Sequence, residues 1–278
     1  MSIADRIKAN AKVVGSNIQD SETAKLEKIF DNMFYLEKKP EEESEFVRAV
    51  MTRGQDTQER IGLHTSALIA KEKDFCLRAQ VLSLLYHQLQ GEQLPARTKR
   101  VFEEGNAVHE KWQRLFLRAG YSKVNQLDVT QYDAGRMIQF TPDIICRIPQ
   151  FYDGPMIGEI KSVNAIQYSK MQKHPSAGKQ LQCYMYLTGI EKGFVLNENK
   201  NTQEFKLELY SKDESVIVDF IDRLDQVQYY YQKAIGQHIM VKRPADAVSV
   251  GCTRCSKCAH KLSCWGLPGG KRRLDSNG

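Results

Sequence analysis

Asp143, Glu159 and Lys161 fall close together in residues 140–162, written FTPDIICRIPQFYDGPMIGEIKS. Two short apolar runs flank a turn cluster rich in Pro, Asp and Gly, which predicts a β-hairpin. Glu159 and Lys161 are two residues apart, so on a strand their side chains project from the same face. If the hairpin pairs in its simplest register, Asp143 lies across from them. The sequence therefore predicts that Asp143, Glu159 and Lys161 converge on one point.

These three residue types fit metal-assisted hydrolysis of a phosphodiester. Carboxylate oxygens are the ligands that Mg2+ prefers, and a site with one or two carboxylates leaves positions open for water and for substrate phosphate. A lysine beside such a site can orient the attacking water and neutralise developing charge. The alternative is structural: Glu159 and Lys161 form an ion pair on an exposed strand, and Asp143 lies in a turn.

A second chemical signal is the run CTRCSKCAHKLSC, which holds Cys252, Cys255, Cys258 and Cys264. Thiolates at CxxC spacing bind zinc or hold an iron–sulfur cluster. A local zinc knuckle could use all four thiols, or His260 in place of one, whereas the spacing favours iron and sulfur. The isolated Cys76 reads by itself as a small core residue.

The most regular helix is expected from about Arg97 to Ala119, and His109 lies on its apolar stripe. An imidazole there is either a core residue or a further ligand of a carboxylate metal site, particularly for Mn2+. A later helix at about 176–187 places Gln180 and Tyr184 one turn apart on one face, as surface or functional residues. The stripe around His109 consists of Val101, Phe102, Val108, Trp112, Leu115 and Phe116.

The bulk composition is that of an ordinary globular protein. The chain has 278 residues, of which 41% are hydrophobic and 27% charged, and a formal net charge of +6. No apolar run approaches the roughly 18 residues that a membrane-spanning helix needs, and the N-terminus lacks the apolar core of a signal peptide. We therefore expect a cytoplasmic protein. Six basic residues and no acidic one fall between Cys252 and Arg273, which suits a polyanionic substrate. For Lys271–Arg273, which precede a polar ending, a solvated tail is the favoured interpretation.

The order of expected elements predicts a mixed α/β (α+β) fold, with a central mixed sheet flanked by helices. We expect four parts: an N-terminal helical region (1–65), a core (66–250), a cysteine segment (251–268) and a polar tail (269–278). Leu26, Ile29, Phe30, Met33 and Phe34 mark a first helix, and Glu41–Arg53 a second. Further helices are expected at about 75–89 and 213–236, and strands at 123–130, 136–148, 156–163, 193–197 and 204–210.

Taken in order, these motifs resemble the RecB-like branch of the PD-(D/E)XK nucleases. The pattern is His109, Asp143, Glu159-x-Lys161 and Gln180-xxx-Tyr184, with Cys76 upstream and Cys255-xx-Cys258-xxxxx-Cys264 downstream. More narrowly, it is similar to the iron–sulfur members, among them the CRISPR-associated exonucleases and the AddB nuclease domain. The resemblance spans about Leu63 to Trp265.

The resemblance implies a role for each residue on a restriction-endonuclease-like core. His109, Asp143, Glu159 and the main-chain carbonyl of Ile160 would bind the catalytic Mg2+ or Mn2+, and Lys161 would assist the attacking water. Gln180 and Tyr184 would position DNA. The same resemblance makes Cys76, Cys255, Cys258 and Cys264 the ligands of a [4Fe-4S] cluster. Cys252 is then surplus, and whether the first ligand is Cys76 or Cys252 stays open.

A cluster that joins Cys76 to the C-terminal thiols would close a loop of roughly 180 residues, and by chain entropy such a cross-link is worth about 5 kcal/mol. The function expected is metal-dependent DNA exonuclease activity on single strands or DNA ends, in recombination, repair, or viral or CRISPR DNA processing. The chain has no Walker GxxxxGK[ST] motif, so unwinding would need a separate helicase or recombination partner. A zinc-stabilised, non-catalytic DNA-binding or adaptor module and an endonuclease of the same fold are the alternatives.

Overall fold

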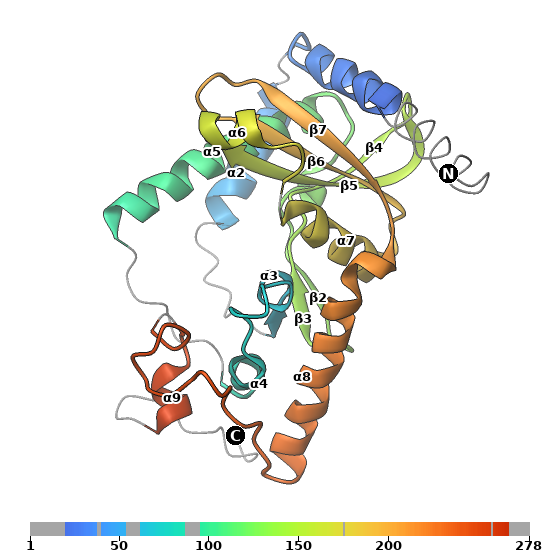
Figure 1. Ribbon diagram of the computed structural model, residues 1–278. Helices are drawn as coiled ribbons and strands as arrows, with labels where there is room; N and C mark the ends of the chain where they lie inside the picture. Colours follow the sequence, from blue (N-terminus) through green and yellow to red (C-terminus); the bar gives the residue numbers. More distant parts are fainter. Residues whose placement is uncertain are drawn as a thin grey trace, which may run out of the picture. The chain divides into compact units, whose positions relative to one another are not determined.

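The computed structural model describes residues 20–37, 40–53, 62–86, 95–174, 176–256 and 258–266 (Figure 1). The chain divides into two compact units, each assembled from separate stretches of sequence. Unit 1 comprises Met1–Arg53, Arg100–Val129 and Pro142–Lys212, and unit 2 comprises Gly54–Lys99, Thr130–Thr141 and Asp213–Gly278.

Unit 1 is built on a four-stranded mixed sheet. Its strands are β4 (Ile144–Ile148), β5 (Tyr152–Val163), β6 (Lys192–Asn199) and β7 (Phe205–Ser211), in the order β4-β5-β6-β7. The outer pairs are antiparallel, whereas β5 and β6 are parallel. Parallel neighbours need a crossover, and here it contains α6 (Ala165–Lys170) and α7 (Ala177–Thr188). The predicted mixed sheet with flanking helices is confirmed.

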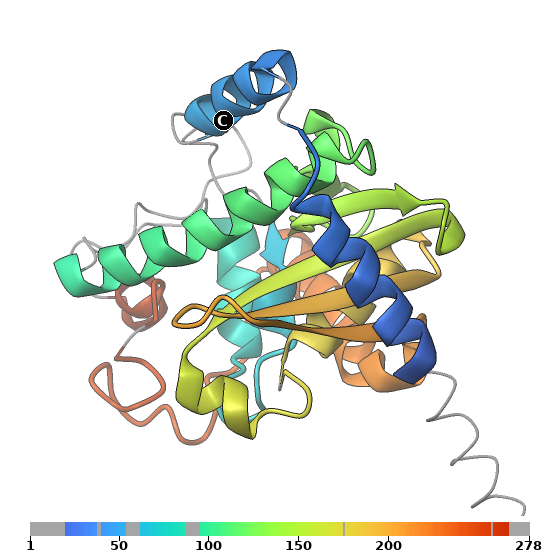
Figure 2. The same ribbon diagram turned by 90° about the horizontal axis from the view of Figure 1, so that it is seen from above.

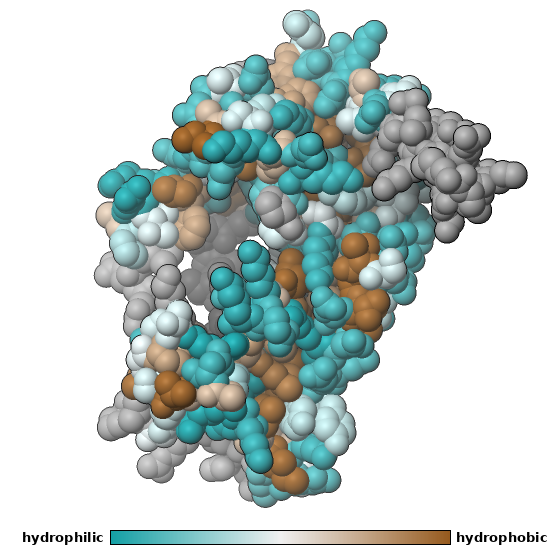
Figure 3. Space-filling view, in the orientation of Figure 1, coloured by the Kyte–Doolittle hydropathy of each residue, from teal (hydrophilic) through white to brown (hydrophobic). Residues whose placement is uncertain are grey.

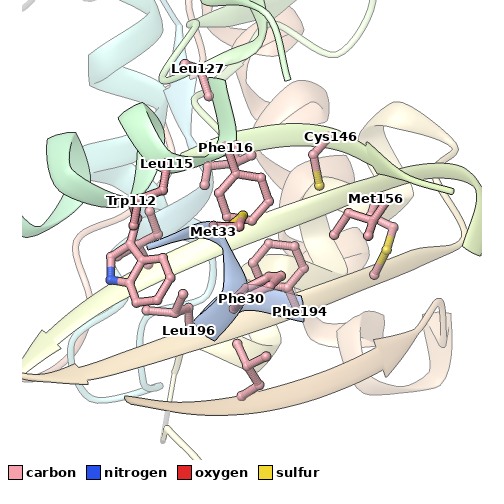
Figure 4. Packing of buried hydrophobic residues seen from close by; sticks show 14 of the residues in the cluster. Phe30, Met33, Trp112, Leu115, Phe116, Leu127, Cys146, Met156, Phe194 and Leu196 are labelled. Carbon is pink, nitrogen blue, oxygen red and sulfur yellow. The ribbon is translucent and has the colours of Figure 1, made fainter. Parts of the chain in front are cut away.

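The face of this sheet opposite to α7 carries the aromatic core of unit 1. Helix α5 (Ala96–Arg118) and a helix at residues 20–33 cover it, and the second of these lies across the strands in Figure 2. The centroid of the Phe30 ring lies 5.1 Å from that of Phe116 and 5.3 Å from that of Phe194 (Figure 4). A side chain at position 158 would collide with the Phe194 ring, so Gly158 lets this ring lie against the sheet. Helix α2 (Pro40–Arg53) completes the unit and buries Phe46.

Unit 2 combines a small sheet with helices. Its strands β1 (Leu63–His64), β2 (Gln131–Asp133) and β3 (Ile138–Phe140) pair in the order β1-β3-β2. Arg223 holds the turn after α3, because its guanidinium donates to the carbonyls of Leu68 and Ala70 and to Glu72. The helices of the unit are α3 (Thr65–Leu68), α4 (Leu77–Leu85), η2 (Glu214–Ile217), α8 (Val218–Gly236) and α9 (Lys261–Trp265).

Two of the predicted strands are wrong. Residues 123–130 form a 3-10 turn, η1 (Val124–Gln126), and not a strand. The predicted strand at 136–148 is divided into β3 and β4, which belong to different sheets. Pro142 lies between them, and proline, which lacks an N–H group, cannot donate to a continuous ladder.

Other predictions differ in extent. The apolar stripe predicted for α5 includes Val101 and Phe102, but both are more than half exposed, because the buried residues of this helix begin nearly two turns later at Val108. Leu89, residues 1–19 and the tail 269–278 lie outside the described residues. The predicted part boundaries at residues 65, 250 and 268 remain a prediction. No helix in the described part of the chain is both long enough and apolar enough to cross a membrane.

Candidate active site and cysteine cavity

The hairpin register brings Asp143 beside Glu159. Ile144 pairs with Gly158 in the antiparallel β4–β5 ladder, so the preceding residue, Asp143, falls opposite Glu159. Asp143 Oδ2 accepts a hydrogen bond of 2.6 Å from the Ile160 main-chain N–H. The aspartate is therefore fixed against β5 by the backbone of the residue next to Glu159, as the hairpin pattern predicts.

Glu159 and Lys161 lie on the face of β5 that α7 covers. Glu159 is buried, with 1% of its surface exposed, and Lys161 donates a short hydrogen bond to Glu159 Oε1. Burial and the neighbouring Asp143 raise the pKa of Glu159 to about 8, although Lys161 opposes the shift. Burial by itself would lower the pKa of Lys161, but the two carboxylates outweigh it and raise that pKa above its ordinary value. The pair is thus a buried one, in contrast to the exposed pair of the structural alternative.

His109 reaches the same point from α5. Its Nδ1 lies 3.3 Å from Asp143 Oδ1, and its side chain is 28% exposed. Burial would lower the pKa of His109, but the charge and hydrogen bond of Asp143 prevail and raise it. His109 is therefore neither a sealed core residue nor a surface residue. It contacts the carboxylate with which it would share a metal.

Two buried contacts that the sequence reading missed fix α5 over the site. Gln113, one turn after His109, donates 3.0 Å to the main-chain carbonyl of Asp143. Glu198, at the end of β6, accepts from Lys111 (2.7 Å) and from the Trp112 indole (2.6 Å). A polar residue one turn from His109, and the polar NEN ending of the apolar strand β6, are the signals that could have indicated them.

Helix α7 places Gln180 and Tyr184 together. Gln180 Nε2 donates to Tyr184 Oη over 2.6 Å, and Tyr184 is buried. Burial raises the pKa of Tyr184, and the charges of Glu159 and Asp143 raise it further, which indicates that the phenol lies within electrostatic reach of both carboxylates. Tyr184 is therefore not the surface residue that one interpretation of the sequence allowed.

The donor set fits a hard divalent cation. Glu159 Oε2 is buried and has no hydrogen-bond partner in the described part of the chain, and a buried carboxylate oxygen left without a partner is costly. A cation at this oxygen would satisfy it, with Asp143 and the His109 imidazole close by. Within the described ranges, however, no three His, Cys, Asp or Glu side chains already surround a single point as a finished metal site. The metal-ligand roles therefore stay a prediction.

A polar network continues from the site along the same face of the sheet. Asn197 pairs with Lys161 in the β5–β6 ladder, and its amide donates 2.7 Å to the buried Glu208 on β7. Glu208 also accepts from the Tyr210 hydroxyl (2.6 Å) and from the main-chain N–H of His174 (2.7 Å). The sequence reading overlooked this network, because its members are spread over two strands and a loop.

In unit 2, four cysteines line one small cavity: Cys76 at the start of α4, and Cys255, Cys258 and Cys264 from the C-terminal segment. Burial raises the pKa of Cys258, and the neighbouring Cys76 and Cys264 raise it further. Arg78 Nε donates to Cys264 Sγ over 3.1 Å. Arg243 and Arg254 also line the cavity, so positive charge surrounds the four thiols.

Cys252 and His260 are neighbours of these thiols but do not line this cavity. Neither is among its described lining residues. Cys252 hydrogen-bonds with Cys255, and the buried His260 lies 2.8 Å from the Ser83 hydroxyl through its Nε2. Of the two candidates that the sequence left open for the first thiol, Cys76 is the one at the cavity.

Comparison with known proteins gives weak likenesses. No protein-family model matches this chain, and no curated protein matches it in sequence. LHK-Exo in complex with dAMP is 14% identical, over 62% of this chain and 88% of that one, with a TM-score of 0.45. The alkaline exonuclease LHK-Exo from Laribacter hongkongensis is 13% identical, over 62% of this chain and 88% of that one, with a TM-score of 0.40. A phage-related exonuclease from Haemophilus somnus is 14% identical, over 59% of this chain and 82% of that one, with a TM-score of 0.40. At such values function must be inferred from the site itself.

Proposed function

We propose that the protein is a metal-dependent deoxyribonuclease that acts as an exonuclease. The observation that carries the proposal is the convergence of Asp143, Glu159, Lys161 and His109 at the β4–β5 hairpin, with a buried Glu159 oxygen that lacks a partner in the described chain. The order of motifs, including Gln180-xxx-Tyr184, is that of RecB-like PD-(D/E)XK nucleases.

In this proposal Asp143, Glu159, His109 and the Ile160 carbonyl would hold Mg2+ or Mn2+. Such a cation would supply Lewis-acid chemistry, which polarises a phosphodiester and lowers the pKa of a water molecule. Lys161, already beside Glu159, orients the nucleophile and offsets the negative charge that accumulates on the phosphate oxygens. Its raised pKa keeps it protonated, so it serves as a cation and a hydrogen-bond donor.

The remaining site residues position the substrate. The Gln180–Tyr184 pair contacts the DNA strand, and the high pKa of Tyr184 keeps its phenol neutral near the carboxylates. Phosphate contacts supply most non-specific DNA affinity. We expect single-stranded DNA or DNA ends as substrate, a separate helicase or recombination partner, and a cytoplasmic location.

We further propose that Cys76, Cys255, Cys258 and Cys264 hold a [4Fe-4S] cluster. Support comes from the shared cavity, and from Arg78, Arg243 and Arg254, whose charge would balance an anionic cluster. Such a cluster would join α4 to the C-terminal segment and so clasp unit 2. Iron and acid-labile sulfide in the purified protein would agree with this assignment, whereas one equivalent of zinc would favour a zinc-held module.

The activity test uses DNA strands labelled at either end, incubated with Mg2+ or Mn2+ and with a chelator. We expect metal-dependent release of mononucleotides or short products from one end, and no cleavage by Asp143→Asn. Covalently closed circular single strands separate the two nuclease classes, since an exonuclease leaves them intact. His109→Ala should weaken Mn2+ binding in calorimetry, and unchanged affinity would remove His109 from the ligand set. Failure of the wild-type protein to cleave any strand with metal would contradict the proposal.

A further inference from the structure

A second cavity lies next to the proposed active site, between α6 and the loop that follows it. It has a volume of about 910 Å3, within the range of ligand pockets, which is roughly 300–1,000 Å3. Strand β5 connects the two sites, since Val163, which lines the cavity, is two residues beyond Lys161 on the same face. The lining also includes Ile166, Lys170, Met171, Lys173 and His174.

The cavity lining is basic. Lys170 and Lys173 are exposed there, and none of the described lining residues is acidic. Ile166 has 69% of its surface exposed to solvent, so it offers an apolar surface beside these lysines. Hydrophilic residues predominate over α6 in Figure 3, with a hydrophobic patch beside them. Cations beside an exposed apolar side chain suit a nucleotide, because its phosphate is anionic and its base has two apolar faces.

Two hydrogen bonds made by His174 fix the loop that carries Lys173. The His174 main-chain N–H donates 2.7 Å to the buried Glu208, and His174 Nδ1 accepts 3.2 Å from the N–H of Ala177 at the start of α7. Lys173 itself lies over the Tyr210 ring, 5.7 Å from its centroid. The lysine is thus presented by a loop already fixed at two points, which lowers the entropic cost of binding.

We propose that this cavity is a nucleotide subsite for the strand being degraded. Lys170 and Lys173 contact phosphates next to the scissile one, and Ile166 and Met171 contact the adjoining base. The inference rests on the proposed nuclease function, because it takes Glu159 and Lys161 as the point where the strand is cut. It assigns the direction in which the strand leaves that point, along β5 toward α6.

The test measures binding of fluorescein-labelled oligo-dT by anisotropy, in EDTA so that no cleavage occurs. We expect Lys170→Ala/Lys173→Ala to weaken binding by about tenfold and to reduce the slope of log K against log salt by about 1.4, since each single-strand phosphate contact contributes about 0.7. Ile166→Ser should weaken binding without changing this slope, because no charge is lost. The matched control is Lys25→Ala/Lys28→Ala, two exposed lysines on the helix at 20–33, which covers the opposite face of the sheet. That variant should behave as wild type.

The outcomes separate this inference from the nuclease proposal. If the Lys170/Lys173 variant binds oligo-dT with wild-type affinity and slope while the wild type degrades DNA with metal, the subsite is refuted and the nuclease stands. If the variant loses affinity and slope as expected but no protein cleaves DNA with metal, the cavity is a DNA site and the nuclease proposal fails. An equal loss of affinity in the control variant would also refute the subsite, because it would show a diffuse charge effect.

Discussion

Replacing Glu159 by glutamine should stabilise the metal-free protein. Glu159 is buried, and its pKa is raised to about 8 from an ordinary value of 4.5. The folded state therefore holds the proton more tightly than the unfolded state does. For an acid with a raised pKa, the free energy of unfolding is unaffected below about pH 4.5, and it falls as the pH rises from there through about 8.

The magnitude follows from these two pKa values. Because pH 7 lies well above the unfolded-state pKa and below the folded-state pKa, most of the difference between the two values lowers the free energy of unfolding at this pH. The loss is about 3 kcal/mol. Glutamine has nearly the same shape, keeps an acceptor for Lys161 and never ionises. In proteins of this size class 1 kcal/mol shifts Tm by roughly 2–4 °C, so a difference of about 3 kcal/mol should make Glu159→Gln melt roughly 6–12 °C above the wild type near neutral pH.

The assay is thermal unfolding in EDTA from about pH 5 to about pH 8.5, followed by the same series with Mg2+ or Mn2+. The difference between the two proteins should grow with pH in EDTA. Metal should then stabilise only the wild type, by about 2.7 kcal/mol at one hundred times the dissociation constant. Glu198→Gln is the matched control: Glu198 is equally buried but accepts from both Lys111 and Trp112, so its replacement should destabilise the protein.

Two results would refute this reasoning. One is a Glu159→Gln protein that melts below the wild type at about pH 8 in EDTA, because the ionised carboxylate would then be a net stabilising group. The other is equal stabilisation of both proteins by Mg2+, which would place the cation elsewhere.

Three further predictions concern the lysine, the cluster and the tyrosine. Lys161→Ala should lower the rate of strand cleavage on the order of 100-fold with little change in DNA affinity, measured by single-turnover kinetics; a rate within a few-fold of wild type would exclude a role in the chemical step. Cys76→Ala should lose iron and visible absorbance and melt at a clearly lower temperature, whereas Cys252→Ala should keep both, and the reverse pattern would indicate a local C-terminal site. Tyr184→Phe should reduce kcat/KM for DNA about tenfold through loss of its hydrogen-bonding hydroxyl while Tm changes little; wild-type kcat/KM would mean that the tyrosine only packs.

The sequence was informative where contacts are local. The β4–β5 hairpin is specified by two apolar runs and a turn, and this fixes Asp143 opposite Glu159 without knowledge of the rest of the chain. The strand period of two then puts Lys161 beside Glu159. The spacing of Cys255, Cys258 and Cys264 likewise implies that these thiols lie close together, since successive tight turns join them.

Sequence patterns failed where a distant part of the chain decides the outcome. Pro142 divides an apolar run between two sheets, and the runs of apolar residues on its two sides look like a single strand until their different partners are known. The apolar pattern of α5 continues through Val101 and Phe102, but the pattern does not show where the neighbouring elements end. Both residues are therefore exposed although they fit the pattern.

What the sequence by itself determined was the set of reactive side chains and their local spacing: acids, a lysine and thiols in an order that suits the proposed metal-assisted hydrolysis and the proposed metal or cluster binding. Only the tertiary structure decided which of them meet. It set His109 against Asp143, through the Gln113 and Glu198 contacts that orient α5, and it placed Cys76 at the cavity of the C-terminal thiols. These contacts depend on packing between elements that are far apart in the chain, and a local sequence pattern does not show which distant elements pack together.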